Sequence, residues 1–441
     1  MSRHSKWAFA AISAVLMGTG ISCMSSAQQL RQSAGKQAEF YLHDGDRVVF
    51  YGDSITDQRL YTTYIETYCA TRFPGRRFTF VHSGWGGDRV TGGGGGPIDV
   101  RLKRDVLPYK PTVITICLGM NDGSYRAFDK AIFDTYIKGY RHILDKLKAE
   151  LPAARITLLT APAFDDVTRP PNFPGGYNET LKRYGEAVAN LAWEYRCRLA
   201  DTNAPLVAAL EKANEMNPAG AAAIIRDRVH PGPGGHMVMA AAVLKAWNAP
   251  ATVADIRLDA RRAQLVSAVN TSVSGVNRKA DGIAFTHTDG ALPWPLDRDT
   301  ARNPDMLLSL RSTKFENSLN RFLLRITGLP AGNYALKADG QEVARVTEKE
   351  LNRGVNLAAI AELPENRQAS EVLGLARKHN DIHFRRWRQV QFAVSRNNET
   401  PPPDVMSTME ALDAQDAEAA EAEHQAAKPK PHTMEAVRVG R

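Results

Sequence analysis

Five short apolar runs alternate with longer helical segments over the first 250 residues, and this alternation limits the folds open to the chain. The expected strands lie at residues 47–51, 78–81, 112–118, 155–161 and 197–200. The expected helices lie at residues 60–73, 129–150, 177–196 and 234–248. This spacing favours parallel strands joined by right-handed crossovers, with helices on both faces of the sheet. Such sheets bind ligands beyond the carboxyl ends of their strands. The sequence therefore predicts an α/β fold with functional residues just after the strands.

A serine follows the first of these runs, in Gly52-Asp53-Ser54. A tight turn there would place its hydroxyl near outward-pointing N–H groups and the positive end of the next helix. A serine hydroxyl needs a base to act as a nucleophile. His230 is a candidate because histidine exchanges protons near neutral pH, and Asp227, three residues earlier, would orient its ring. Taken alone, an Asp-x-x-His pair is more often structural.

Two glycine-containing turns follow further strands. Gly84-Trp85-Gly86-Gly87-Asp88 comes after residues 78–81, and Gly119-Met120-Asn121-Asp122 comes after residues 112–118. A glycine N–H and an asparagine amide are suitable donors to an oxyanion. The alternatives are a turn chosen for its backbone freedom and a helix cap.

Taken in order, the Gly-Asp-Ser, Gly-Gly-Asp, Gly-x-Asn-Asp and Asp-x-x-His blocks resemble those of the SGNH (GDSL) hydrolase family over about residues 45–248. The resemblance implies a three-layer α/β/α sandwich with a flavodoxin-like parallel sheet. It implies a serine esterase in which Ser54 is the nucleophile, with Asp227 and His230 as its partners. Ser54, Gly87 and Asn121 would form the oxyanion hole. The second block often opens with Asn where this chain has His82, which leaves Gly84 as an alternative to Gly87.

The implied chemistry is two-step acyl transfer, which needs no cofactor. No His, Cys or carboxylate pair has zinc-ligand spacing with a matching pair elsewhere, so no metal site is expected. The nearest polar candidates for substrate contacts are Asp57, Arg59, Asp88 and Arg89. For each of these residues, a purely structural role is the alternative to a contact with substrate.

The first residues are typical of an exported protein. In residues 1–27, Arg3 and Lys6 precede a short apolar run and a small-residue cleavage site, which together predict a signal peptide. Cys23 lies in a weak lipobox, so lipid anchoring is the alternative to a periplasmic or secreted soluble form. No later apolar run reaches the roughly 18–20 residues of a membrane span. The remaining cysteines, an odd number, are expected to be buried free thiols.

The chain carries a net charge of +8, without a nucleic-acid motif. Export and a basic body suit an extracellular polymer, so we expect an O-acetyl ester on a carbohydrate as the substrate. Lipase, lysophospholipase, thioesterase and general esterase activities are alternatives, as is acyl transfer to an alcohol. A non-catalytic glycan-binding module is the alternative of another class. The oligomeric state is left open.

The sequence divides into a hydrolase domain at 40–250, an accessory region at 251–395 and a tail at 396–441. Strands at 322–327, 333–338 and 341–346, joined in part by an Asp339-Gly340 turn, precede a long helix at 365–392. Three aromatics of the accessory region could stack on a glycan, although core packing is the favoured interpretation: Trp294, Tyr334 and Trp387. The Pro-rich and acidic, alanine-rich composition of the tail predicts disorder or a marginal helix.

Overall fold

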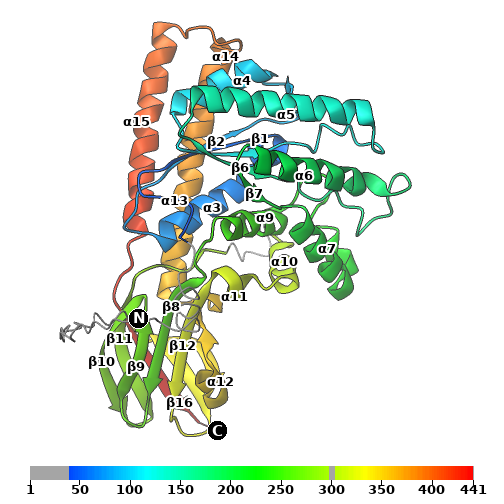
Figure 1. Ribbon diagram of the computed structural model, residues 1–441. Coiled ribbons are helices and arrows are strands. Elements are labelled where there is room, and N and C mark those ends of the chain that lie inside the picture. Colours follow the sequence, from blue (N-terminus) through cyan, green and yellow to red (C-terminus); the bar gives the residue numbers. More distant parts are fainter. Residues whose placement is uncertain (1–38, 297–302, 441) are drawn as a thin grey trace, which may run out of the picture. The chain divides into compact units, whose positions relative to one another are not determined.

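The expected parallel sheet forms the centre of the first half of the chain (Figure 1). This computed structural model describes residues 39–296 and 303–440. The strand order is β2-β1-β5-β6-β7, and every neighbouring pair is parallel. The strands are β1 (Arg47–Gly52), β2 (Thr79–Gly84), β5 (Val113–Cys117), β6 (Arg155–Leu159) and β7 (Arg198–Ala200). The predicted doubly wound sheet is therefore confirmed.

Alternate residues of β1 face two separate cores, which places helices on both sides of the sheet. Val48 and Phe50 belong to a core shared with α3 (Leu60–Arg72) and α9 (Pro233–Ala246). Val49 and Tyr51 belong to a second core. That core is shared with α4 (Ile98–Asp105), α5 (Lys130–Glu150) and α6 (Gly176–Glu194). The side-chain alternation of one buried strand thus positions both helical layers.

A β-sandwich follows the α/β body, and it is larger than the sequence predicts. Its five-stranded sheet has the order β10-β11-β16-β13-β14, and its four-stranded sheet has the order β15-β12-β8-β9. The expected strands are present as β12 (Arg321–Thr327), β13 (Asn333–Ala338) and β14 (Gln341–Thr347). The others are β8 (Thr252–Asp259), β9 (Gln264–Val269), β10 (Thr271–Lys279), β11 (Gly282–Asp289), β15 (Val355–Asn356) and β16 (His432–Val439). The Asp339-Gly340 turn has positive φ at both residues, as a tight hairpin turn requires.

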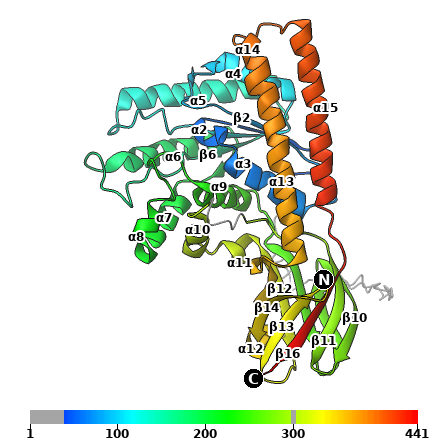
Figure 2. The same cartoon turned by 180° about the vertical axis from the view of Figure 1, so that it is seen from behind.

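The tail, predicted as disordered or as a marginal helix, contains a long helix and a strand in the structure. Residues 403–426 form the helix α15 (Pro403–Ala426), which lies beside α13 (Pro364–Phe384) in both views (Figures 1 and 2). Strand β16 pairs with β11 on one side and β13 on the other. Its apolar residues Met434 and Ala436 are buried in the sandwich core. Composition alone indicated disorder because the tail is ordered by its contacts with α13, β11 and β13, which do not adjoin it in the sequence.

The long predicted helix is present as α13, a π-helical stretch over residues 385–391 and α14 (Phe392–Val394). Trp294, Tyr334 and Trp387 are all buried, so core packing rather than glycan stacking accounts for them. The shorter helices are α2 (Ser54–Asp57), α7 (Ala204–Met216), α8 (Pro218–Ala221), α10 (Met306–Ser312), α11 (Phe315–Leu319) and α12 (Glu348–Arg353).

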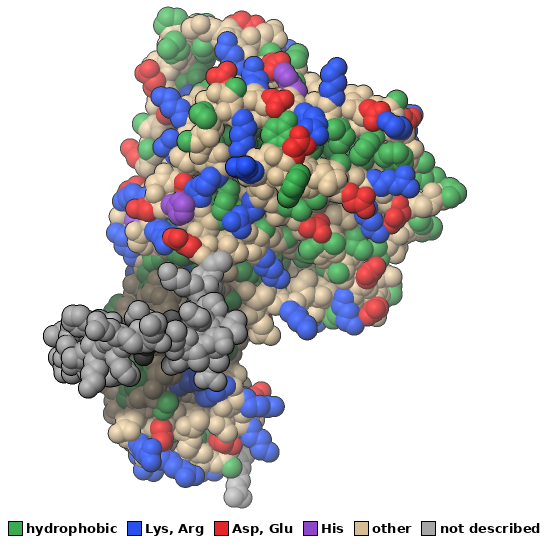
Figure 3. Space-filling model, in the orientation of Figure 1, with side chains coloured by type: hydrophobic (Ala, Val, Ile, Leu, Met, Phe, Trp, Pro, Cys, Tyr) green, Lys and Arg blue, Asp and Glu red, His purple; other side chains and the backbone are tan. Residues whose placement is uncertain are grey.

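Two further properties bear on the predicted environment of the protein. Among the described residues, no helix combines the length and the apolar character needed to cross a bilayer. The face in Figure 3 shows Lys and Arg side chains interspersed with Asp and Glu rather than gathered in one stripe. The predicted signal peptide and Cys23 lie outside the described residues.

Candidate active site

Ser54 begins a short helix at the carboxyl end of β1. Asp53 caps this helix, because its Oδ1 accepts a hydrogen bond of 3.0 Å from the N–H of Ile55. Gly52 leaves no room for a side chain, since a Cβ there would lie 2.2 Å from Oγ1 of Thr56 and 2.7 Å from the carbonyl oxygen of Cys117. The Gly-Asp-Ser sequence therefore permits a close turn against β5 and a capped helix start.

His230 links Ser54 to Asp227 through two short hydrogen bonds. Its Nε2 lies 2.8 Å from Oγ of Ser54, and its Nδ1 lies 2.6 Å from Oδ2 of Asp227. The other oxygen of Asp227 accepts the backbone N–H groups of Val229 and His230 at 3.0 and 2.7 Å. Burial raises the pKa of Asp227, but these N–H groups and His230 outweigh burial and lower it overall. A carboxylate held in this way can orient the ring and stabilise its protonated form.

The loop that carries His230 is held by residues that the sequence analysis did not identify. Arg228 adopts the left-handed conformation, with φ of 72°, and its carbonyl oxygen accepts the N–H of Asp165 at 2.9 Å. Asp305 is buried, and its Oδ2 accepts the N–H of Gly234 at 2.7 Å in the first turn of α9. No sequence signal pointed to Asp305, because it follows His230 by 75 residues and matches no motif.

Gly87 and Asn121 lie on neighbouring loops after β2 and β5. Gly87 is exposed and has a φ of +76°, a conformation that favours glycine. The side-chain amide of Asn121 donates to the carbonyl oxygen of Asp88 at 3.0 Å, and its own oxygen accepts the hydroxyl of Tyr125 at 2.8 Å. These two bonds fix the orientation of the amide and leave its second hydrogen for another acceptor. Tyr125 is a further residue that the sequence analysis missed.

Gly84, the alternative to Gly87, has no comparable freedom. A Cβ at this position would lie 2.1 Å from the backbone nitrogen of Asp57. Gly84 is buried where β2 passes the helix that follows Ser54. Close backbone packing therefore explains why residue 84 is a glycine.

The four candidates for substrate contacts are mostly engaged within the protein. Asp88 is fully buried, and its carboxylate pairs with Arg101. Asp57 accepts the N–H of Gly86 at 3.1 Å. Arg59 donates to Oδ1 of Asp381 at 2.9 Å. Arg89 is exposed and donates to Oγ of Ser124 at 3.1 Å, which leaves it as the candidate open to solvent.

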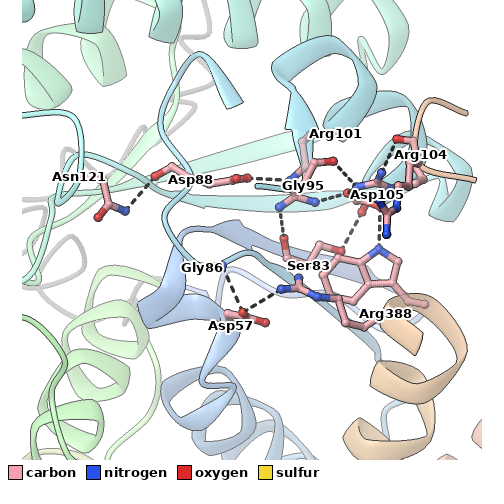
Figure 4. A network of polar contacts seen from close by, with 12 residues as sticks. Asp57, Ser83, Gly86, Asp88, Gly95, Arg101, Arg104, Asp105, Asn121 and Arg388 are labelled. Atoms are coloured by element: carbon pink, nitrogen blue, oxygen red, sulfur yellow. Dashed lines mark hydrogen bonds and ion pairs between the residues drawn. The ribbon is translucent and has the colours of Figure 1, made fainter. Parts of the chain in front are cut away.

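A buried polar network connects the loop around Gly87 to the C-terminal helices (Figure 4). Arg101 donates to Oδ2 of Asp88 at 2.6 Å and to the carbonyl oxygen of Ser83 at 2.9 Å, and it also contacts Asp105. The indole N–H of Trp387 donates to Asp105 at 2.6 Å. The network therefore fixes the position of Asp88, whose carbonyl oxygen accepts the hydrogen bond from the side-chain amide of Asn121.

The segment after α13 also reaches the turn beside Gly87. The guanidinium of Arg388 lies 3.1 Å from the centroid of the Trp85 ring, and its Nη2 lies 3.5 Å from Oδ2 of Asp57. This is the same oxygen that accepts the N–H of Gly86. Contacts from the C-terminal region therefore support the conformation of the loop after β2.

Two carboxyl groups beneath the loops are buried. Burial raises the pKa of Asp53 to about 8 and that of Asp122 to about 7. Oδ1 of Asp122 accepts the N–H of Val90 at 2.9 Å, which ties the end of the loop after β2 to the loop after β5. Among the described residues, two groupings of His and carboxylate side chains that could hold a metal ion lie elsewhere, and neither includes Ser54, Asp227 or His230.

Known proteins are similar to this chain in fold and, over its first half, in sequence. Residues 50–238 match the family described as GDSL-like Lipase/Acylhydrolase. An acetylxylan esterase of Geobacillus stearothermophilus is 27% identical over 220 residues, which cover 46% of this chain and 93% of that protein. The structure of a gut microbial diltiazem-metabolizing enzyme is 26% identical, with a TM-score of 0.81, over 92% of this chain and all of that one. The acetyl xylan esterase AlAXEase is 23% identical, with a TM-score of 0.37, over 45% of this chain and 98% of that one.

The protein is thus an ester-bond hydrolase built on a parallel α/β sheet. Residues 50–238 form a domain of the SGNH/GDSL hydrolase family, as the four sequence blocks indicated. The diltiazem-metabolizing enzyme covers 92% of the chain, so that likeness extends beyond the α/β body.

Proposed function

We propose that this protein is an exported serine esterase that removes acetyl groups from a carbohydrate. The observation that carries the mechanism is the chain of hydrogen bonds from Ser54 through His230 to Asp227, at 2.8 and 2.6 Å. The similarity to an acetylxylan esterase supports a carbohydrate acetate as the substrate. Export rests on the character of residues 1–27.

In the proposed first step, Oγ of Ser54 attacks the ester carbonyl carbon while Nε2 of His230 takes the hydroxyl proton. The carbonyl oxygen becomes an oxyanion, which the N–H groups of Ser54 and Gly87 and the free amide hydrogen of Asn121 stabilise. Collapse of the tetrahedral intermediate breaks the bond to the sugar oxygen, and His230 protonates that oxygen. An acetyl-enzyme remains.

In the second step, water attacks the acetyl carbonyl and gives its proton to His230. The second tetrahedral intermediate releases acetic acid as the proton returns to Ser54. Asp227 keeps Nδ1 of His230 protonated throughout, so that Nε2 faces the serine as an acceptor. Transfer to an added alcohol would use the same residues with the alcohol in place of water.

The test is a chain-length series of p-nitrophenyl esters from acetate to palmitate, together with acetylated xylan, acetylated pectin and diltiazem. Ser54→Ala should abolish turnover without changing the thermal unfolding midpoint, whereas the control Ser272→Ala on the sandwich should retain activity. Asn121→Ala should lower kcat by about 10²–10³ with a smaller effect on KM. Retained turnover in Ser54→Ala, or an Asn121→Ala effect confined to KM, would contradict these assignments.

Substrate preference separates the remaining alternatives. Activity restricted to acetate and acetylated glycans supports the carbohydrate esterase. A preference for long acyl chains would instead indicate a lipase. A preference for simple aryl acetates, with acetylated glycans inert, would indicate a general esterase.

A further inference from the structure

Five side chains that commonly bind metal ions converge at one end of the β-sandwich. His287 and Asp289 lie two residues apart on β11, so they face the same side of the sheet. His432 on β16 lies directly opposite His287 in the strand register, and the two ring centroids are 6.5 Å apart. Asp339, in the turn after β13, and Glu365, in the first turn of α13, complete the group.

The three innermost members approach one another without closing good hydrogen bonds. Nδ1 of His287 lies 3.2 Å from Oδ2 of Asp289, and its Nε2 lies 3.4 Å from Oε1 of Glu365. Charge-assisted hydrogen bonds measure about 2.7–2.9 Å. Because the two ring nitrogens of His287 point in different directions, only one of them can bind a given ion. One ligand atom each of His287, Asp289 and Glu365 nevertheless lies within 4.8 Å of the other two, which is close enough for a shared ion.

Glu365 is the strongest sign of a missing partner. Its side chain is 1% exposed, and within the described part of the chain neither of its oxygens has a hydrogen-bond partner. Nε2 of His287, also in a side chain 1% exposed, has none either. Buried carboxylate oxygens are costly unless they are bonded or coordinate a metal.

The local charges are also unbalanced. Among the described residues, no Lys or Arg forms an ion pair with Asp289, Asp339 or Glu365. Two carboxylates around a protonated His287 leave one buried negative charge, whereas a divalent cation with a neutral imidazole leaves none.

His432 lies beside these three residues, and its Nδ1 lies 2.7 Å from Oδ2 of Asp339. A cavity of about 380 Å³, lined in part by Asp339, Gln368 and His432, lies next to them.

We propose that His287, Asp289 and Glu365 bind a divalent transition-metal ion, for which Zn²⁺ fits best, with water in the fourth position. One imidazole with two carboxylates is a donor set that zinc accepts in tetrahedral geometry. The ion would join β11 of the sandwich to the first turn of α13. The site is separate from Ser54 and does not depend on the proposed esterase mechanism.

The second buried group of this kind, Glu66, His379 and Glu423, serves as the matched comparison. There Nδ1 of His379 lies 2.8 Å from Oε1 of Glu66, and the other oxygen of Glu66 lies 3.1 Å from Nε2 of His82. His379 and Glu66 thus already have partners at ordinary hydrogen-bond distances. We expect this group to remain metal-free.

The experiment uses the untagged full chain, treated with a chelator, dialysed against Zn²⁺ alone and analysed for metal by mass spectrometry. The wild type should retain one Zn²⁺ per chain, and its thermal unfolding midpoint should rise with Zn²⁺. Glu365→Gln, which preserves the side-chain shape, should lose the ion and the shift. Glu423→Gln and Ser54→Ala should retain both.

Binding of Co²⁺ at the same place offers a measurement that does not depend on stability. Its visible absorption should indicate a tetrahedral site in the wild type and in Glu423→Gln, and should be absent in Glu365→Gln, whose folding is checked by circular dichroism. A wild type that retains no Zn²⁺ after dialysis would overturn the proposal. Retention of the ion by folded Glu365→Gln, or its loss in Glu423→Gln, would also overturn it.

Discussion

Replacing Asp227 by alanine and by asparagine should lower activity to different extents, and the structure indicates which loss is larger. The side chains of Asp227 and His230 are 56% and 35% exposed. Opposite charges about 4 Å apart attract by about 1 kcal/mol in water and about 4 kcal/mol at an effective dielectric constant near 20. At this exposure the interaction lies toward the water limit, at about 1–2 kcal/mol. Asp227→Ala should therefore lower kcat/KM only about 5- to 30-fold.

Asparagine should be worse than alanine because of the two N–H groups that Asp227 accepts. They come from Val229 and His230 and both point at Oδ1. The oxygen of an asparagine must stay with them, so its NH₂ group faces Nδ1 of His230. That donor forces the ring proton onto Nε2, where it blocks acceptance of the Ser54 proton. The same exchange costs about 10⁴ in a buried triad, and exposure here should reduce the loss to about 10²–10³.

The assay is kcat/KM for p-nitrophenyl acetate between pH 6 and 9 for the wild type and both variants. Asp99→Asn is the matched control, because Asp99 also pairs with a histidine, His142, at 2.9 Å and is similarly exposed, at 55%. The control should leave activity unchanged. An asparagine variant at least as active as the alanine variant would refute the tautomer argument. An alanine variant as inactive as His230→Ala would refute the argument from exposure.

Two further predictions concern buried charges. Burial raises the pKa of Asp53 to about 8 from an ordinary 3.8, so the folded protein holds a proton that the unfolded chain releases, and stability should fall as pH rises from about 4 to about 8. Asp53→Asn cannot ionise, so its unfolding midpoint relative to wild type should increase between pH 5 and 9, and a constant difference would contradict this. Arg101→Gln leaves Asp88 and Asp105 buried without their shared cation and should cost about 3–5 kcal/mol in urea unfolding, with a loss of turnover. The exposed cation Arg77 is the control: Arg77→Gln should change little, and equal effects of the two variants would show that the network in Figure 4 is not a structural support.

The parts of the fold that the sequence predicted are those determined by neighbouring residues. The five parallel strands were found because each is a short apolar run followed by a helix. The residues of the hydrogen-bonded site were found because each stands in a short motif directly after a strand or before a helix. The distances from Ser54 to His230 and from His230 to Asp227 agree with the roles that the resemblance assigned to them.

The parts that were missed depend on partners far away in the sequence. Trp387 and Asp105 are 282 residues apart, and Arg388 and Asp57 are 331 apart, so no local pattern connects them. Strands β9 and β10 are largely exposed and lack a strong apolar alternation. Strand β16 alternates weakly, and its place in the sheet is defined by β11 and β13 rather than by its own residues.

The central position of β16 has a consequence for how the chain is made. Every other strand of the sandwich precedes it, so the β10–β11 and β13–β14 hairpins each keep an open edge until residues 432–439 have been synthesised. Open edges are templates for pairing with other chains. A chain that lacks residues 432–439 would therefore be prone to aggregation, whereas an equally small loss from an exposed loop would be harmless. The five-stranded sheet can therefore form completely only after residue 439 has been synthesised.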